Sequence, residues 1–274
     1  MKHLSGNIIA GAAALLVGAP AGYAATITVD DFTTDQFVQD LPGTQDESSL
    51  AGGSMFGGTR YLEVFTVPPI TGGTQLSASN PVGGNAGLSF NNGAGSVGAG
   101  YVVYDGDDNS VERADGTGIN RPDATVLIGP DDVGVNTSIL DEDIVMGSVE
   151  NTFFSFDLSD FNPGTGGSTA LFSAYAFDTL GNVGQFEQTV GAFEISPDLF
   201  LNEFSGDVDW TSVSALAFSI DSRVGNTEEN INFDGRVGPI AISSVPLPAS
   251  ALMLLSAIGA VGGAGFVRRK KSFA

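Results

Sequence analysis

The chain has 274 residues, and its charged residues are very unevenly distributed. The body between Thr26 and Val245 contains all 32 Asp and Glu residues but only five arginines, a net charge of −27, and it has no Cys, Lys or His. This composition excludes Ser-His-Asp and Cys-His nucleophiles, Schiff-base lysines, Cys/His zinc sites and disulfides, and no nucleic acid is expected as a partner because phosphate binding needs a basic surface.

The N-terminal segment, residues 1–25, has the three parts of a secretory signal peptide. Lys2 supplies the positive charge, and Ile8 to Val17 form an apolar stretch that is too short to span a bilayer. Gly22-Tyr23-Ala24 then places small residues at the two positions that signal peptidase inspects. The sequence therefore predicts export of the chain.

The body, residues 26–244, shows short β-type runs separated by Gly, Asn and Asp turns, and no helical periodicity. An all-β fold is therefore predicted, an antiparallel β-sandwich of jelly-roll type. Val29-Asp30-Asp31-Phe32 and Asp209-Trp210-Thr211-Ser212-Val213 are similar to segments of galactose-binding-like jelly rolls. The predicted strands are Ile27–Phe32, Tyr61–Val67, Gly87–Phe90, Gly98–Tyr104, Thr152–Leu158, Ala170–Phe177, Gly184–Ile195, Val213–Ile220 and Pro239–Ser243.

One loop of the body has the composition of a cation site. Asp105-Gly106-Asp107-Asp108-Asn109 follows a predicted strand, and its alternating oxygen ligands Asp105, Asp107 and Asn109 could hold Ca²⁺. The loop does not follow the EF-hand pattern, because its twelfth position is Gly116. A solvated turn is the alternative interpretation, since Asp, Gly and Asn also favour turns.

Two further features could indicate a carbohydrate-active site. A carboxylate pair could hydrolyse glycosides, and Asp209 is the acid to inspect because an apolar neighbour such as Trp210 raises a carboxyl pKa. A surface Asp at a turn before a strand is the preferred interpretation of Asp209. Tyr61, Tyr101, Tyr104 and Trp210 could stack on sugars, although each also fits a strand as a packed side chain. Packing is the preferred interpretation for all four, and no catalytic site is predicted.

The C-terminal segment, residues 245–274, has three successive parts. Val245-Pro246-Leu247-Pro248-Ala249 precedes an uncharged stretch, residues 249–267, which is long enough to cross a bilayer as a helix. Arg268, Arg269, Lys270 and Lys271 follow as a stop-transfer cluster that would remain in the cytoplasm. The sequence predicts a transmembrane helix with the body outside the inner membrane.

This C-terminal arrangement closely resembles the PEP-CTERM sorting signal in its VPLPA variant. The resemblance covers about the last thirty residues and carries the motif Val245-Pro246-Leu247-Pro248-Ala249 complete, with Leu247 where other members have an acidic residue. It implies recognition by an exosortase, a membrane-embedded protease, with anchoring in the inner membrane before processing and delivery to the cell surface or extracellular matrix afterwards.

Together these features predict an exported, exosortase-processed protein with a non-catalytic structural or interaction role in the exopolysaccharide layer. One alternative is a calcium-dependent carbohydrate-binding module that uses the Asp105 loop. Another is a carboxylate-based polysaccharide hydrolase. The expected partners are the exosortase and the inner membrane, with exopolysaccharide as the candidate ligand of the body and calcium as the candidate cofactor.

Overall fold

The computed structural model describes residues 26–41, 47–66, 72–79, 86–93, 95–106, 135–156, 158–162, 169–190, 198–222 and 234–245. Thr26–Ser244 forms one compact unit. The predicted signal peptide, residues 246–249 of the sorting motif, the predicted helix and the basic cluster lie outside the described residues. Within those residues, no helix is long and apolar enough to cross a membrane.

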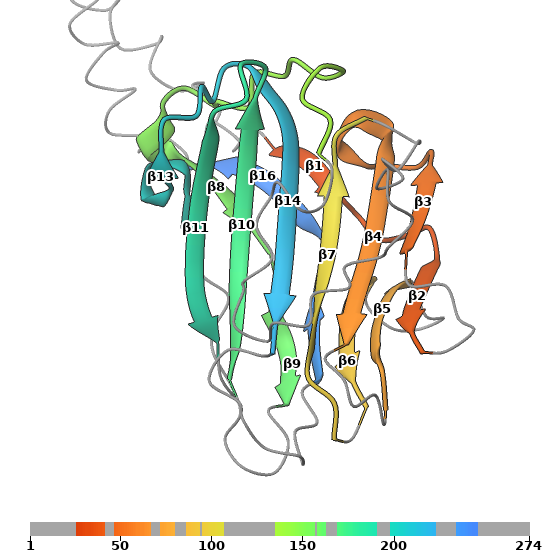
Figure 1. The fold of residues 1–274 in the computed structure, drawn as a ribbon. Coiled ribbons are helices and arrows are strands. Elements are labelled where there is room, and N and C mark those ends of the chain that lie inside the picture. The colour runs from red at the N-terminus through yellow and green to blue at the C-terminus, as the bar shows by residue number, and fades with distance from the viewer. Residues whose placement is uncertain are drawn as a thin grey trace, which may run out of the picture. The chain divides into compact units, whose positions relative to one another are not determined.

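The compact unit is an all-β structure made of three antiparallel sheets (Figure 1). A seven-stranded sheet has the order β13-β11-β10-β14-β7-β4-β3, a five-stranded sheet β2-β5-β6-β15-β9, and a four-stranded sheet β1-β16-β8-β12. The strands are β1 (Thr26–Asp30), β2 (Gln36–Asp40), β3 (Glu47–Ala51), β4 (Thr59–Thr66), β5 (Thr74–Ser79), β6 (Gly87–Asn92), β7 (Gly98–Tyr104), β8 (Thr152–Ser155), β9 (Leu158–Asn162), β10 (Ala170–Asp178), β11 (Val183–Val190), β12 (Leu199–Phe200), β13 (Ser205–Gly206), β14 (Val213–Asp221), β15 (Asp234–Val237) and β16 (Ile240–Ser244). Short 3₁₀ turns lie at Phe56–Gly58, Val149–Asn151 and Leu201–Glu203.

The core lies between the seven-stranded sheet and the two smaller sheets, which stand behind it in Figure 1. Every residue of β4, β7 and β14 is buried, so these central strands lie covered on both faces, and even polar residues such as Arg60 and Glu63 are enclosed. Aromatic rings fill the centre: Phe218 lies edge-to-face against Phe154, with ring centroids 5.8 Å apart, and stacks near Phe172. The predicted all-β class is therefore confirmed.

The strand boundaries differ from the predicted ones in two informative places. The first strand ends at Asp30, before the predicted Phe32, because Phe32 has a left-handed backbone with φ of 52°. The predicted strand Thr152–Leu158 is two strands, β8 and β9, which belong to different sheets. The sequence did not indicate six strands, which are short or carry polar residues: β2, β3, β5, β12, β13 and β15.

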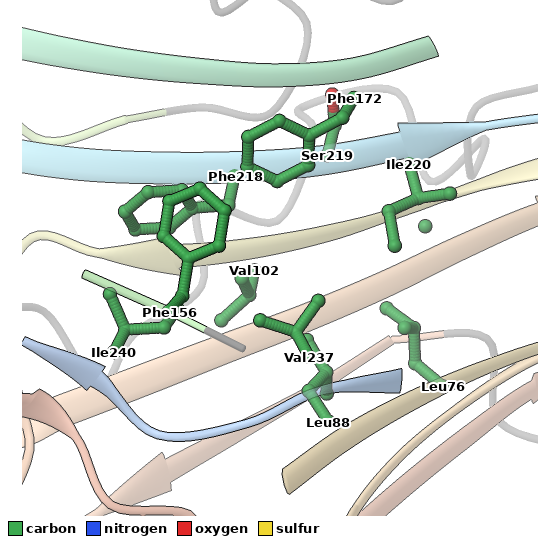
Figure 2. Close-up of a pocket in the computed structure, with 11 residues that line it drawn as sticks. Leu76, Leu88, Val102, Phe156, Phe172, Phe218, Ser219, Ile220, Val237 and Ile240 are labelled. Atoms are coloured by element: carbon green, nitrogen blue, oxygen red, sulfur yellow. The ribbon is translucent and has the colours of Figure 1, made fainter. Parts of the chain in front are cut away.

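A small cavity of about 20 Å³ remains inside the core, between the seven-stranded and five-stranded sheets (Figure 2). The side chains of Val102, Phe218 and Ile220 face it from one sheet, and those of Leu88 and Val237 from the other. A cavity of this size could hold about one water molecule, but an apolar lining offers it no partners. We therefore interpret it as a packing defect and not as a ligand site.

Filling this cavity should stabilise the protein. Val237→Ile adds one methylene at the cavity wall and should raise the free energy of unfolding by about 0.5–1 kcal/mol, measured by urea denaturation of residues 26–244. Val213→Ile is the matched control, since Val213 is fully buried but does not line the cavity. The control should be neutral or destabilising because it overpacks the core. Equal effects of both changes would contradict this interpretation.

Candidate functional site

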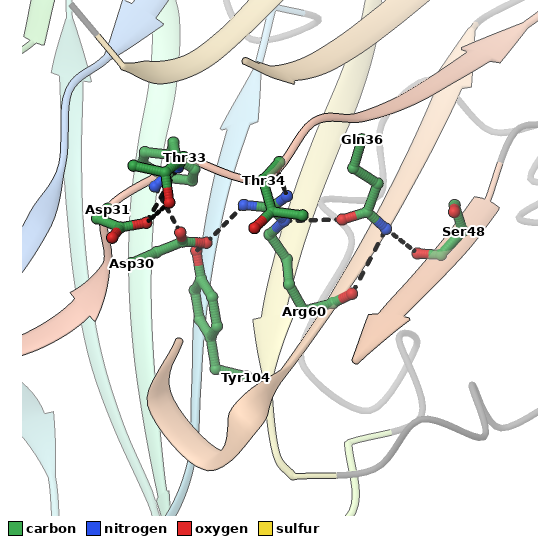
Figure 3. Close-up of polar contacts among 9 residues, drawn as sticks. Asp30, Asp31, Thr33, Thr34, Gln36, Ser48, Arg60 and Tyr104 are labelled. Atoms are coloured by element: carbon green, nitrogen blue, oxygen red, sulfur yellow. Dashed lines mark hydrogen bonds and ion pairs between the residues drawn. The ribbon is translucent and has the colours of Figure 1, made fainter. Parts of the chain in front are cut away.

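The most concentrated buried polar group in the described structure surrounds the carboxylate of Asp30 (Figure 3). Asp30 Oδ2 accepts hydrogen bonds from Arg60 Nη1 and from the Tyr104 hydroxyl, each at 2.8 Å. Asp30 Oδ1 accepts the backbone N–H of Phe32 at 2.7 Å, which fixes the left-handed turn there. Asp30, Arg60 and Tyr104 are at most 1% exposed, so this ion pair is fully enclosed.

The guanidinium of Arg60 has further partners on the chain that follows β1. Arg60 Nε donates to Gln36 Oε1 at 2.7 Å, and Nη2 donates to the backbone carbonyl of Thr34 at 2.6 Å. The guanidinium carbon also lies 5.6 Å from the centroid of the Phe32 ring. Gln36 in turn donates from Nε2 to the Ser48 carbonyl at 2.8 Å, so the arrangement extends to β3.

Desolvation dominates the electrostatics of this group. Burial raises the pKa of Asp30 above its ordinary value, while the charge of Arg60 and three hydrogen bonds oppose the rise. Burial and the nearby Asp30 charge raise the pKa of Tyr104 well above its ordinary value, so its hydroxyl stays protonated and donates. Both Asp30 oxygens are engaged and out of reach of solvent. This arrangement suits a structural role. Arg60 precedes the predicted strand Tyr61–Val67, so the sequence did not indicate this buried ion pair.

A second buried polar group lies at the opposite ends of β4 and β7. Thr66 Oγ1 donates to Thr74 Oγ1 at 2.9 Å, and Thr74 Oγ1 donates to Asn92 Oδ1 at 3.0 Å. Asn92 Nδ2 then donates to Ser222 Oγ, which donates to the Gly98 carbonyl at 3.0 Å. This chain joins the five-stranded sheet to the seven-stranded sheet and leaves no open chemical site.

The predicted calcium site can be followed only at its first residue. Asp105 lies directly after β7 and is buried, and its Oδ2 accepts the backbone N–H of Asn136 at 2.9 Å. The other two proposed ligands, Asp107 and Asn109, lie outside the described residues. Among the residues that the structure does describe, no group of three or more metal-binding side chains occurs. Calcium binding at this loop remains a prediction.

Asp209 is a surface turn residue, as the preferred interpretation has it, and Trp210 does not raise its pKa. Asp209 is exposed, and its carboxylate accepts the hydroxyl of Thr211 at 2.7 Å and the Thr211 N–H at 3.0 Å, which lower its pKa. Trp210 points away into the core, where it packs edge-to-face against Phe204 with centroids 5.0 Å apart. Asp209 is therefore a turn residue and not an acid in an apolar pocket.

A nearby carboxylate, which sequence reasoning missed, organises the β10–β11 turn. Asp178 Oδ1 accepts the N–H groups of Leu180 and Asn182, both at 2.9 Å. Its Oδ2 accepts Asn182 Nδ2 at 2.8 Å and the Asp209 N–H at 3.0 Å. These hydrogen bonds outweigh desolvation and lower the pKa of Asp178. The turn-forming residues Asp178, Gly181 and Asn182 could have indicated this turn in the sequence.

The aromatic residues considered as sugar platforms are buried, and the preferred packing interpretation is confirmed. Tyr61 and Tyr101 lie on the outer face of the seven-stranded sheet and are 8% and 2% exposed. The Tyr61 hydroxyl donates to Glu47 Oε2 at 2.8 Å, and burial raises its pKa. Tyr104 and Trp210 belong to the inner core. None of the four presents an open ring face.

Comparison with known proteins does not identify a family or a function for the chain. No protein-family model matches the chain, and no curated protein matches it. One similar solved structure is a DUF4465 family protein from Bacteroides ovatus, 13% identical, with 81% of this chain and 98% of that chain covered and a TM-score of 0.22. A TM-score this low carries no argument about fold or function. The fold assignment therefore rests on the strand pairing itself.

Removing the charge of Arg60 should destabilise the body strongly. Arg60→Met leaves the Asp30 carboxylate buried without its ion-pair partner, and the free energy of unfolding should fall by about 3–5 kcal/mol in chemical denaturation. Adding Asp30→Asn should recover part of this loss. Arg236→Met is the control and should cost about 1 kcal/mol or less, because Arg236 is only half-buried and its Nη2 has no hydrogen-bond partner to lose. A loss of only about 1 kcal/mol or less for Arg60→Met would contradict the role assigned to the ion pair.

Asp178 should make stability sensitive to acid. Its folded pKa lies below the ordinary value of 3.8, so the unfolded chain binds more protons and stability falls as the pH drops from about 3.8 through the folded pKa. In Asp178→Asn the amide replaces the titrating carboxylate, and this part of the acid dependence should disappear. Denaturation curves between pH 2 and 6 test the point. Identical pH profiles for the two proteins would argue against it.

Proposed function

We propose that the chain is an exported, exosortase-processed protein of the cell surface or extracellular matrix. The observation that carries the proposal is the order of three elements after β16, namely the motif Val245–Ala249, the apolar stretch 249–267 and the basic cluster 268–271. Before processing, the apolar stretch would hold the protein in the inner membrane. The exosortase and the inner membrane are then its first partners.

The place of the motif relative to the body supports this assignment. β16 ends at Ser244, and Val245, the first motif residue, is 44% exposed. The apolar stretch thus follows the folded body without a long spacer. The motif begins at the residue that follows the last strand of the compact unit.

The body itself we propose to have a non-catalytic structural or interaction role in the exopolysaccharide layer, with a jelly-roll arrangement of its strands. The long connections that bring β7 beside β14 and β1 beside β16 support that arrangement. Two buried acids near chain turns, Asp30 and Asp178, are occupied by hydrogen bonds within the fold. The high negative charge of the body favours solubility in a hydrated matrix.

The sorting proposal predicts a specific processing defect. Changing Pro246 and Pro248 to Ala in the full-length chain should leave an unprocessed, membrane-associated form, because the motif that the protease reads is altered. Immunoblots of membrane and extracellular fractions measure this. Pro239→Ala is the matched control, since Pro239 is an exposed body proline outside the motif. Unchanged size and location of the double variant would overturn the assignment.

A further inference from the structure

The outer face of the seven-stranded sheet, which is turned toward the viewer in Figure 1, is buried. An antiparallel sheet that packs on a core with one face commonly exposes the other face to water. Here a second apolar cluster, separate from the core, lies on that other face and is at most 8% exposed. We call it the outer cluster, and its large side chains are Tyr61, Phe65, Tyr101, Val103, Tyr175 and Phe177.

The strand register makes the outer cluster continuous across four strands. Tyr61 on β4 lies opposite Val103 on β7. Ala217 on β14 lies opposite both Val103 and Tyr175, on the two strands beside it. Adjacent strands are about 4.8 Å apart, so the row from Tyr61 to Tyr175 spans roughly 14 Å. On β11, beyond this row, Glu187 is exposed, so the buried region ends before that strand.

The described residues account for only a small part of this burial. Among them, one apolar side chain from outside the seven-stranded sheet packs against the outer cluster, that of Val135. The other partly buried apolar residue in contact with the cluster, Val183, belongs to β11 of the same sheet. The burial is a property of a single chain, so more of this chain must lie over the row.

Residues 107–134, which lie outside the described residues, have both ends at this face. Asp105, directly after β7, is buried and its Oδ2 accepts the N–H of Asn136 at 2.9 Å, so the chain leaves and returns at one point. Val135, the next residue after the segment, already packs against the outer cluster. An extended chain advances about 3.3 Å per residue, so roughly ten residues are enough to cross the row and return.

The other segments outside the described residues do not fit this face. Residues 223–233 begin after Ser222, which belongs to the buried polar group between the sheets, and end at Asp234 of β15 in the five-stranded sheet. The remaining internal stretches, of which residues 191–197 are the longest, are too short to cross the row and return. The two terminal segments lie outside the compact unit Thr26–Ser244.

A buried carboxylate on the same face requires a positive charge. Glu63 is 5% exposed and lies opposite Tyr101 of the outer cluster. The Tyr61 hydroxyl lies 2.8 Å from Glu47 Oε2 and 3.3 Å from Glu63 Oε2, so two carboxylates meet at this hydroxyl. Enclosing a carboxylate is costly unless a cation and hydrogen-bond donors compensate its charge.

The arginines of the body narrow the source of that charge. The body has no Lys or His, so the cation must be one of its five arginines. Arg60 is engaged in the inner core, Arg236 belongs to the five-stranded sheet, and Arg223 follows β14, two strands away from β4. The other two, Arg113 and Arg121, both belong to the segment that begins and ends at this face.

We propose that residues 107–134 pack over the outer cluster as a further layer of the body, with Arg113 or Arg121 paired with Glu63. The inference goes beyond the proposed function and does not rest on it. It means that the largest sheet offers no free face to a polysaccharide or to a second copy of the chain.

The tyrosines report on this layer directly. Four of the five tyrosines of the chain lie in residues 26–244, the compact unit. Tyr61, Tyr101 and Tyr175 belong to the outer cluster, whereas Tyr104 lies in the inner core. All four should resist nitration by tetranitromethane in the native protein, because none presents an open ring.

Replacing residues 107–134 by a Gly-Ser sequence of equal length removes the side chains of the proposed layer and keeps the chain connected. The three outer tyrosines should then be nitrated at least about tenfold faster, while Tyr104 stays protected. Peptide mass spectrometry measures each site. The same replacement of residues 223–233 is the matched control and should leave all four tyrosines protected.

The ion pair has its own test, which also serves if the replaced chain does not fold. Either Arg113→Gln or Arg121→Gln should raise the equilibrium constant of unfolding about tenfold or more, measured by urea denaturation. Most of this increase should disappear in a Glu63→Gln background, because the two residues act as one pair. Arg223→Gln is the control, and its effect should be the same with and without Glu63→Gln.

Two results would overturn the proposal: outer tyrosines that stay protected after residues 107–134 are replaced, or additive effects of Glu63→Gln with both Arg113→Gln and Arg121→Gln. Protection of the native tyrosines that is lost when a dimer dissociates on dilution would also overturn it, in favour of a second copy as the covering layer. None of these measurements depends on how the C-terminal segment is processed.

Discussion

A positive charge enclosed in the interior must be neutralised and hydrogen-bonded, and Arg60 imposes this requirement on the body. Its partners come from β1, from the turn after it and from β2, while Arg60 itself belongs to β4 and Tyr104 to β7. These strands belong to all three sheets, so the ion pair with Asp30 lies where the three sheets meet. The sheets can be shifted relative to one another only by exposing or unpairing that charge. The interaction thus selects one arrangement among many that would bury the same apolar side chains.

The core combines polar groups at its two ends with apolar packing between them. Asp30 and Arg60 lie near the start of β4, while Thr66 and Asn92 belong to the group at the end of that strand. Between these groups the facing sheets contact through aromatic and aliphatic side chains, around the small apolar cavity. Apolar contacts are non-directional and set the separation of the layers, whereas hydrogen bonds fix the register at each end. Without disulfides, the body depends on this division for a unique structure.

A structural feature could be predicted from the sequence where it depends on neighbouring residues, and not where it depends on residues far away in the chain. The strands β4, β7, β10 and β14 were predicted because their sequences are rich in apolar and aromatic residues, which suit their largely buried faces. β2, β5 and β15 were missed because most of their outward residues are Gln, Ser, Asp or Arg, which are typical of loops. The left-handed Phe32 depends on the Asp30 carboxylate, whose position is set by a residue thirty places away. Adjacent residues can also diverge: Asp209 faces solvent and Trp210 the core, which no composition argument reveals. The tail assignments rest on local motifs and stay predictions.

The pairing of β1 with β16 has a consequence for how the body is made. Thr26 lies opposite Ser243, so the ladder of the first strand forms with the last one, and among the described residues β1 has besides it the single bridge from Asp30 to Met55. β16 in turn separates β1 from β8, and the four-stranded sheet cannot close until the chain is released to its final strand. Such long-range contacts form slowly and leave earlier segments exposed while they wait. Synthesis from the N-terminus to the C-terminus therefore cannot complete the four-stranded sheet before β16 has been made.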